Sequence, residues 1–409
     1  MNCILYAETR GVVLLDPALF SARTANVSAS IIREILKLTQ GSDIISFGGG
    51  FPSPNSFPVD DMKSINEELL TKYGKEILQY GTTEGFGPLR EIIAKEAANL
   101  GITATKESVL LTTGAQQVID LMAKSLIDKG DVVLVENPTF LAALNVFKMY
   151  EAKIVGVETD KDGLIPEDLE RKIREHSPKL VYVIPNFQNP TGITTSTGRR
   201  KAIMEACGKA GVPLLEDDPY SLVRFEGKHL PSITSFDRWG VAVYASSFSK
   251  TVSPGIRLGY AIAKEDIMKK LVVGKQTTDV CSNNLAQRAV YEFMASGKFH
   301  EHIKEIVAEY KPKRDEMMRL IDEGFPKGTW RSTPEGGLFI WAVLPNGMNT
   351  EELLKKAIAE AKVAYIPGSP FFIEPEMGRD KMRLNFTNAT LEQIRSGMER
   401  LGRVLRENA

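Results

Sequence analysis

The sequence predicts an α/β protein with two parts: a large domain with a mainly parallel seven-stranded sheet and a smaller α+β domain. Three observations lead to this prediction. Apolar strand-like runs alternate with helix-like segments between residues 108 and 263, which favours parallel strands joined by helices. The run Val241–Ala245 is typical of a strand covered on both faces. Beyond residue 296, long helices surround a β-rich stretch with Gly336–Gly337, which indicates a separate α+β unit.

The N-terminal part is predicted to contain a lead-in and a helix over residues 21–40. Its isoleucines and leucines form one apolar face, and Ser30 can cap its start. Three consecutive glycines follow at Gly48–Gly50; they form either a flexible hinge or a loop whose main chain touches a ligand. Two further helices are expected at 60–73 and 88–99.

The large domain then follows as strand, turn and helix in repetition. A strand at 109–113 leads into Gly114 and a helix to residue 128. The other six strands are expected at 131–135, 153–157, 179–184, 212–215, 241–245 and 258–263. Helices between them are expected to end at 150 and to span 165–176 and 199–210.

The small domain is expected to hold helices at 299–323, 350–361 and 390–408, with strands within 328–344 and at 382–386. We expect three regions: residues 1–55 as an N-terminal segment and helix associated with the small domain, 56–295 as the large domain, and 296–409 as the small domain. No internal repeat, low-complexity run or linker stands out in the sequence.

Composition narrows the function classes. The 409 residues are 43% hydrophobic, and 51 basic against 52 acidic residues give a formal net charge of −1. The chain has no overall excess of positive charge, so its composition does not indicate a nucleic-acid partner. No apolar run reaches membrane-spanning length. Three scattered cysteines suit a reducing cytoplasm and offer no metal knuckle. The spacing of His300 and His302 puts them on different helix faces, so no metal site is expected.

Polar clusters follow the predicted strands where each strand ends. Ligands bind at the carboxyl ends of parallel strands, so these clusters are expected to converge on one crevice. They are Gly114–Gln117, Asn137–Phe140, Pro185–Gly192, Glu216–Tyr220 and Ser246–Lys250.

Lys250 is the centre of the predicted site. It follows a buried strand and lies among hydroxyls, which suits an amine that forms a Schiff base beside a bound phosphate. Ser247, Ser249 and Arg257 would supply donors to phosphate oxygens. Considered alone, Lys250 could equally be a surface lysine in a serine-rich loop, because Ser-x-x-Lys is a weak signal that acyl-serine enzymes share.

The other clusters match the needs of a phosphorylated pyridine aldehyde. Asp217 could pair with a protonated pyridine nitrogen, and Phe140 could stack on the ring. The helix start at Gly114, Ala115 and Gln116 could bind phosphate, while Tyr220 and Asn189 could donate to a phenolate oxygen. Each also has a structural alternative, because Asp217, Gly114 and Asn189 occur in turns and Phe140 could be core.

These motifs resemble a known family. Asn189-Pro190-Thr191-Gly192, Asp217-x-x-Tyr220, Ser247-x-Ser249-Lys250 with Arg257, and Arg383 in Arg-Leu-Asn-Phe occur in the order found in class I/II aminotransferases. These belong to the fold-type I enzymes that depend on pyridoxal 5′-phosphate. The likeness extends from about Ser21 to the C-terminus.

The resemblance implies a role for each matching residue. Lys250 would form the Schiff base and shuttle a proton, Asp217 would hold the pyridinium, and Arg383 would bind the substrate α-carboxylate. The loop ending at Gly50 and the amide of Asn189 would add substrate contacts. The counterpart of Tyr80 reaches the neighbouring subunit's phosphate, which implies a homodimer with shared active sites.

Details favour one branch of the family. Phe140 stands where some members have tryptophan, which points away from the aspartate-specific branch. The Ser30–Glu34 segment, Gly48–Pro52 and Gln79-Tyr80 look like the 2-aminoadipate and kynurenine aminotransferases. In the 2-aminoadipate members, the arginine matching Arg33 can meet a distal substrate carboxylate.

The expected function is transfer of an amino group from 2-aminoadipate, an aromatic or a large aliphatic L-amino acid to 2-oxoglutarate, in a cytoplasmic enzyme. A lyase or decarboxylase on the same scaffold is the first alternative. The second is the effector-binding half of a transcription regulator of aminotransferase descent. About twenty residues precede the first expected helix, too few for a helix-turn-helix unit, which disfavours that alternative.

Overall fold

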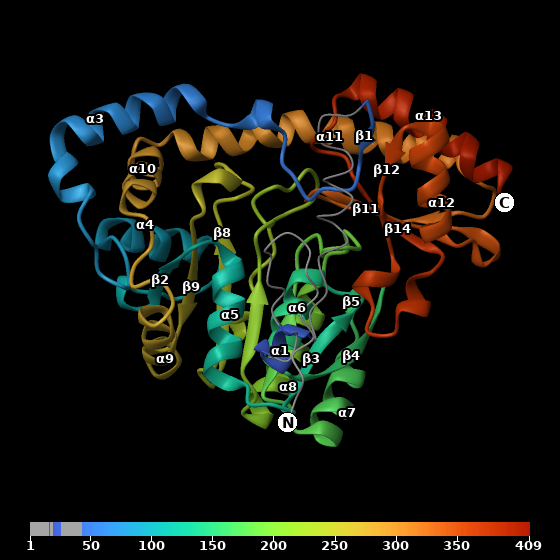
Figure 1. Cartoon of the computed structure of the whole chain (residues 1–409). Coiled ribbons are helices and arrows are strands. Elements are labelled where there is room, and N and C mark those ends of the chain that lie inside the picture. Colours follow the sequence, from blue (N-terminus) through green and yellow to red (C-terminus); the bar gives the residue numbers. More distant parts are fainter. Residues whose placement is uncertain (1–15, 17–18, 26–42) are drawn as a thin grey trace.

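The structure is a computed structural model that describes residue 16, residues 19–25 and residues 43–409. Within these residues the large domain contains an eight-stranded sheet of order β2-β9-β8-β7-β6-β3-β4-β5 (Figure 1). Its strands are β2 (Val109–Thr112), β3 (Val132–Asn137), β4 (Lys153–Asp160), β5 (Gly163–Leu164), β6 (Leu180–Val183), β7 (Leu214–Asp217), β8 (Ala242–Ser247) and β9 (Gly259–Ala263).

The sheet is mainly parallel, as predicted, but the expected number of seven strands was wrong. β9 runs antiparallel to β2 and β8, and β4 and β5 also pair antiparallel. The additional strand β5 has two residues, which pair with Thr159 and Asp160 across a tight turn. Two residues are too few to show a hydrophobic periodicity, so the sequence did not indicate this strand.

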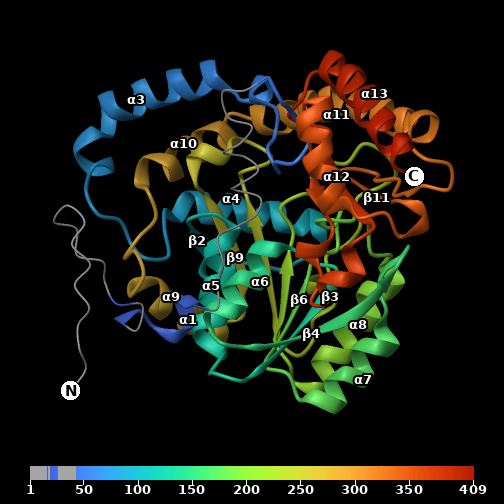
Figure 2. The same ribbon diagram turned by 45° about the vertical axis from the view of Figure 1, so that its right-hand side comes forward.

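Helices cover both faces of the large sheet (Figure 2). One face packs against α5 (Ala115–Leu126), α6 (Leu141–Met149) and α9 (Glu265–Gln276). The other packs against α7 (Pro166–His176) and α8 (Thr197–Ala210), and farther along against α4 (Gly87–Ala97) and α10 (Asn284–Ala295). Alternate strand residues therefore belong to different cores: Val181 and Val183 face α7 and α8, whereas Tyr182 faces α5 and α6.

The small domain contains an antiparallel sheet of order β10-β11-β14-β13. Its elements are α11 (Lys298–Gly324), β10 (Trp330–Arg331), β11 (Phe339–Val343), α12 (Thr350–Lys356), β12 (Val363–Ala364), β13 (Ile366–Pro367), β14 (Lys381–Asn385) and α13 (Leu391–Glu407). The expected helix at 350–361 is α-helical only to Lys356 and ends as a π-helical turn over Ala357–Ala361.

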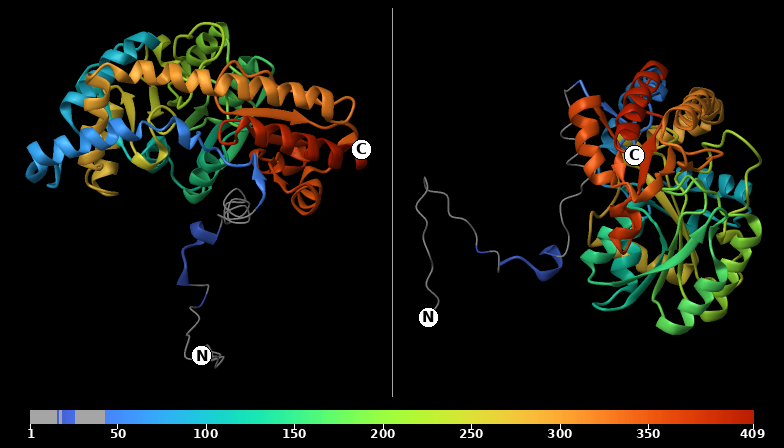
Figure 3. Two further views of the ribbon diagram at one scale, coloured as in Figure 1. Left: turned by 90° about the horizontal axis from the view of Figure 1, so that it is seen from above. Right: turned by 90° about the vertical axis from the view of Figure 1, so that its right-hand side faces the viewer.

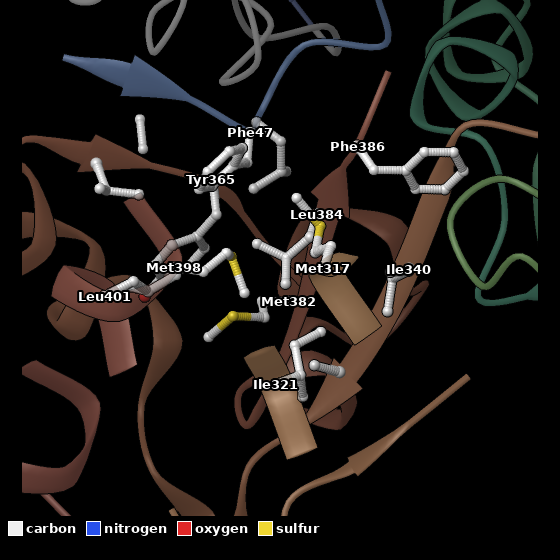
Figure 4. Packing of buried hydrophobic residues seen from close by; sticks show 14 of the residues in the cluster. Phe47, Met317, Ile321, Ile340, Tyr365, Met382, Leu384, Phe386, Met398 and Leu401 are labelled. Carbon is white, nitrogen blue, oxygen red and sulfur yellow. The ribbon is translucent and has the colours of Figure 1, made fainter. Parts of the chain in front are cut away.

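The N-terminal segment is tied to the small domain. Strand β1 (Ile45–Ser46) pairs in parallel with β12. Phe47 is fully buried in a core that also contains Met382, Leu384 and Met398 (Figure 4). The burial of Phe47 and the pairing of β1 therefore fix the position of the chain just before the glycines Gly48–Gly50.

Helix α3 (Val59–Ile77) and α11 lie along the same side of the molecule, and α3 reaches beyond the body of the large domain (Figure 3). Of the lead-in and helix expected at 21–40, the structure describes Ser21 and α1 (Ala22–Ala25), and residues 26–40 lie outside the described residues. Among the described helices, no segment combines the length and apolarity needed to cross a membrane.

Candidate active site

The site lies at the carboxyl ends of the parallel strands, where the sequence placed it. Asp217 and Ser247 are the last residues of the adjacent strands β7 and β8, and Lys250 follows in the turn after β8. Gly114 follows β2 and Asn189 lies in the segment after β6. Parallel register across β6, β7 and β8 brings these residues, distant in sequence, to one edge.

Lys250 points at the N-terminal glycine loop. Its Nζ donates a hydrogen bond to the Gly50 carbonyl at 2.7 Å. Burial lowers the pKa of this amine to about 8, and the positive charges of Arg383 and Arg257 act in the same direction. A lysine in this environment loses its proton much more readily than one in water, as a nucleophilic amine requires.

A cradle for an anion forms around Gly114. This residue has φ +75° and caps the N-terminus of α5, where Ala115 and Gln116 lie in the first turn. A Cβ on Gly114 would come within 2.9 Å of Arg257 Nη2, so the glycine lets the guanidinium approach the helix start. The positive end of a helix dipole and a guanidinium are groups that favour an anion such as phosphate.

Two serine hydroxyls border this cradle. Ser247 Oγ donates to Ser249 Oγ at 2.8 Å and accepts from the Ser249 amide at 3.1 Å. The Arg257 side chain is exposed, and its Nη2 is held by the Thr113 carbonyl at 3.3 Å. The charge and hydroxyl donors predicted for phosphate therefore lie around one turn.

Asp217 is a buried carboxylate with one free oxygen. Its Oδ2 accepts a hydrogen bond of 2.7 Å from the Tyr182 hydroxyl, while Oδ1 is buried without a partner among the described residues. Burial raises the pKa of Asp217 to about 7; the Tyr182 hydrogen bond opposes this rise and the charge of Asp218 adds to it. An orphaned carboxylate oxygen at a ligand site fits a cationic N–H such as that of a pyridinium.

Asn189 and Tyr220 are both buried and close to each other. Burial raises the pKa of Tyr220, and a hydrogen bond with the Asn189 side chain opposes that rise. Asn189 Oδ1 accepts from Arg383 Nη1 at 2.7 Å, which leaves the amide nitrogen to donate elsewhere. Phe140 is half-buried at the start of α6, against the same core as Tyr182.

Arg383 is a fully buried arginine in the middle of the small-domain sheet. Its strand β14 lies between β11 and β13, and its Nη2 donates to the Gly48 carbonyl at 2.7 Å. The guanidinium lies between the rings of Phe339, 4.2 Å away, and Phe371, 5.1 Å away. Burial lowers the pKa of Arg383 to about 10, which still leaves it cationic near neutrality. Its Nε has no partner among the described residues, so the guanidinium can donate to a carboxylate ligand.

Two of the predicted site residues are not found at the carboxyl ends of the strands in the described part of the chain. The Tyr80 side chain is 81% exposed on the segment after α3. Arg33 lies outside the described residues.

The sequence reasoning missed several residues that shape the site. Tyr182 supports Asp217, and Phe339 and Phe371 enclose Arg383. The buried Lys275 bonds Asp279 at 2.8 Å, and Asp279 in turn accepts from Gln117 in the first turn of α5. Only Tyr182 left a readable signal, as a hydroxyl within an otherwise aliphatic buried strand; the others depend on contacts between distant segments.

Together these groups fit pyridoxal 5′-phosphate. The free Asp217 oxygen suits the ring nitrogen, the Gly114 cradle suits the phosphate, and the Lys250 amine suits the aldehyde. The neighbouring Arg383 can hold a carboxylate beside that amine.

Comparisons with known proteins agree with this arrangement. A family profile described as aminotransferase class I and II matches residues 42–401. Aromatic-amino-acid aminotransferase 1 of Thermococcus litoralis is 40% identical over 95% of this chain and 94% of its own length. The 2-aminoadipate transaminase of Thermus thermophilus is 36% identical over 95% and 96%. The crystal structure of Pyrococcus horikoshii kynurenine aminotransferase superposes with a TM-score of 0.91 at 38% identity, covering 95% and 97% of the two chains.

Proposed function

Because the chain belongs to the class I and II aminotransferases, which depend on pyridoxal 5′-phosphate, we propose that it transfers the amino group of an L-amino acid to 2-oxoglutarate. The donors would be 2-aminoadipate, aromatic amino acids such as kynurenine, or large aliphatic amino acids. The names of the similar enzymes support the aromatic and 2-aminoadipate donors of this range. The observation that carries the proposal is geometric: the Lys250 amine and the buried Arg383 guanidinium both donate to carbonyls of the same glycine loop, those of Gly50 and Gly48.

Each residue would act on a separate part of the reactants. Bound at this site, the cofactor supplies an electron sink that stabilises negative charge at the substrate Cα. Lys250 Nζ would take the proton from the substrate Cα and deliver it to the C4′ carbon of the cofactor. Its lowered pKa supports this role, because a base must be partly unprotonated to act. Asp217 Oδ1 would hold the ring nitrogen, and Asn189 and Tyr220 the phenolic oxygen.

Arg383 would orient the substrate by its α-carboxylate. Its terminal nitrogens, which now bond Asn189 and the Gly48 carbonyl, would form the paired contacts that a carboxylate accepts. The two flanking phenyl rings exclude water from the guanidinium and strengthen the ion pair.

The phosphate would be held by Gly114, Ala115, Gln116, Ser247, Ser249 and Arg257. We propose that Tyr80 of a second copy completes this site in a homodimer. The exposed apolar side chains of α3 and the following segment support this, as does the way α3 reaches beyond the body of the large domain (Figure 3). They are Val59, Leu70, Tyr73, Leu78 and Tyr80.

For dicarboxylic donors, Arg33 would bind the distal carboxylate. Arg33→Ala should then reduce turnover of 2-aminoadipate far more than turnover of an aromatic donor. An equal loss for both donors would assign Arg33 to structure.

A donor panel tests the proposed reaction. The purified protein, saturated with pyridoxal 5′-phosphate, is incubated with 2-oxoglutarate and each candidate donor, and the glutamate formed is measured. Glutamate in a one-to-one ratio with donor consumed supports transfer; ammonia released without glutamate would show lyase chemistry instead. Lys250→Ala is the control, and a borohydride-reducible link to the cofactor in that variant would refute the role of Lys250.

A further inference from the structure

Tyr182 is a buried phenol one strand away from the carboxylate expected to face the cofactor. In the register of β6 and β7, Tyr182 pairs with Leu215, and both residues face the core below α5 and α6. The Tyr182 side chain is fully buried, and the Phe147 ring packs edge-on against it at 5.8 Å. Its position is therefore set by the sheet and by α6.

The phenol bonds one oxygen of Asp217 only. The hydroxyl donates to Oδ2 at 2.7 Å, and no residue in the described part of the chain bonds Oδ1. A carboxylate held at one oxygen cannot rotate freely, so Oδ1 keeps a fixed direction. We propose that Tyr182 is a positioning residue for the reaction, which holds Asp217 ionised and aimed so that Oδ1 receives the ring N–H of the bound cofactor.

The electrostatic setting explains why such a donor is needed. Burial raises the pKa of Asp217 to about 7, and the neighbouring Asp218 raises it further. Burial also raises the pKa of Glu136, on β3, to about 8, so this nearby carboxyl is largely neutral at pH 7. Without the Tyr182 hydrogen bond, Asp217 would hold a proton itself more readily and would be a weaker counter-ion for a pyridinium.

A matched tyrosine separates this role from simple packing. Tyr244 lies on the other neighbour of β7, is equally buried and donates to Asp218 Oδ2 at 3.0 Å. Tyr244→Phe removes the same atom from the same sheet, but the carboxylate that it releases is not the one facing the cofactor nitrogen.

The test measures binding to the cofactor-free protein. Tyr182→Phe and Tyr244→Phe are titrated with pyridoxal 5′-phosphate and with its 1-deaza analogue, which has carbon in place of the ring nitrogen. The ligand contact at stake is the charge-assisted hydrogen bond between Asp217 Oδ1 and the ring N–H, and its loss corresponds to about ten- to a hundredfold in Kd. We expect Tyr182→Phe to raise the Kd of pyridoxal 5′-phosphate by this factor and the Kd of the analogue by less than about threefold. Tyr244→Phe should change neither Kd.

If Tyr182→Phe raises the Kd of both ligands equally, or changes neither Kd, the proposal is overturned. A second variant keeps the test independent of folding. In an Asp217→Asn background, adding Tyr182→Phe should leave the ratio of the two Kd values unchanged, and a further change in that ratio would also refute the inference. The inference rests on the cofactor role proposed for Asp217, which fails separately if the wild-type protein binds both ligands equally tightly.

Discussion

Replacing Gly114 by alanine tests the anion cradle directly. At φ +75° and ψ 170°, Gly114 adopts a backbone conformation that is costly for other residues, by about 1–3 kcal/mol. A native domain is stabilised by roughly 5–15 kcal/mol, so the variant should still fold. The new Cβ would lie 2.9 Å from Arg257 Nη2, and the exposed arginine would move away because its far end is flexible.

The movement of Arg257 sets the size of the functional effect. A phosphate that loses one charge-assisted hydrogen bond should bind about ten- to a hundredfold more weakly. We therefore expect Gly114→Ala to raise the Kd of pyridoxal 5′-phosphate by this factor, measured by titrating the cofactor-free protein and following the absorbance of the bound form.

Gly130→Ala is the control for backbone strain. Gly130 also has a positive φ, +87°, but a Cβ there would meet no atom of the described residues within 4 Å. It should lower the free energy of unfolding by about 1–2 kcal/mol without changing the Kd. If Gly114→Ala binds the cofactor like the wild-type protein, or if both variants weaken it equally, the cradle is misassigned.

Three further predictions concern other parts of the site. Phe47→Ala should lower the free energy of unfolding in denaturant by about 3–5 kcal/mol, because the ring is fully buried, whereas Phe51→Ala, at a ring 45% exposed, should change it by less than about 1 kcal/mol. Arg383→Lys should raise the KM of every amino donor about tenfold or more, because lysine cannot form two parallel hydrogen bonds to a carboxylate, while the Kd of the cofactor stays constant. An unchanged KM would show that Arg383 does not bind the substrate carboxylate. Because the pKa of Lys250 is lowered from 10.5 to about 8, the unfolded chain binds more protons than the folded one between these pH values. The free energy of unfolding of the cofactor-free protein should therefore rise with pH in that window, relative to that of Lys250→Met. Parallel plots of this free energy against pH for the two proteins would contradict the shift.

The sequence was most informative where chemistry is local. Lys250, Asp217 and Gly114 could be placed because each follows a recognisable strand, and the geometry of parallel sheets brings strand ends together. Strand limits were harder to predict: β7 extends to Asp217, two residues beyond the predicted end, because main-chain pairing with β8 continues past the apolar run.

Contacts between distant segments were beyond sequence reasoning. Nothing near Arg383 indicates that Phe339 and Phe371 enclose it, since these rings come from other elements of the small domain. Likewise, the pairing of β1 with β12 follows from the burial of Phe47 and not from any local pattern.

The hydrogen bond from Arg383 to the Gly48 carbonyl joins two residues that are 335 positions apart. Lys250, Asp217 and Gly114, by contrast, lie within the continuous stretch that builds the large sheet. The ribosome releases the chain from its N-terminus, and domains fold largely as units. The large sheet can therefore assemble during synthesis, whereas the Gly48 carbonyl gains its bond to Arg383 only after β14, near the C-terminus, has been made. A nascent or C-terminally shortened chain that lacks β14 would thus lack both Arg383 and the hydrogen bond that holds the Gly48 carbonyl.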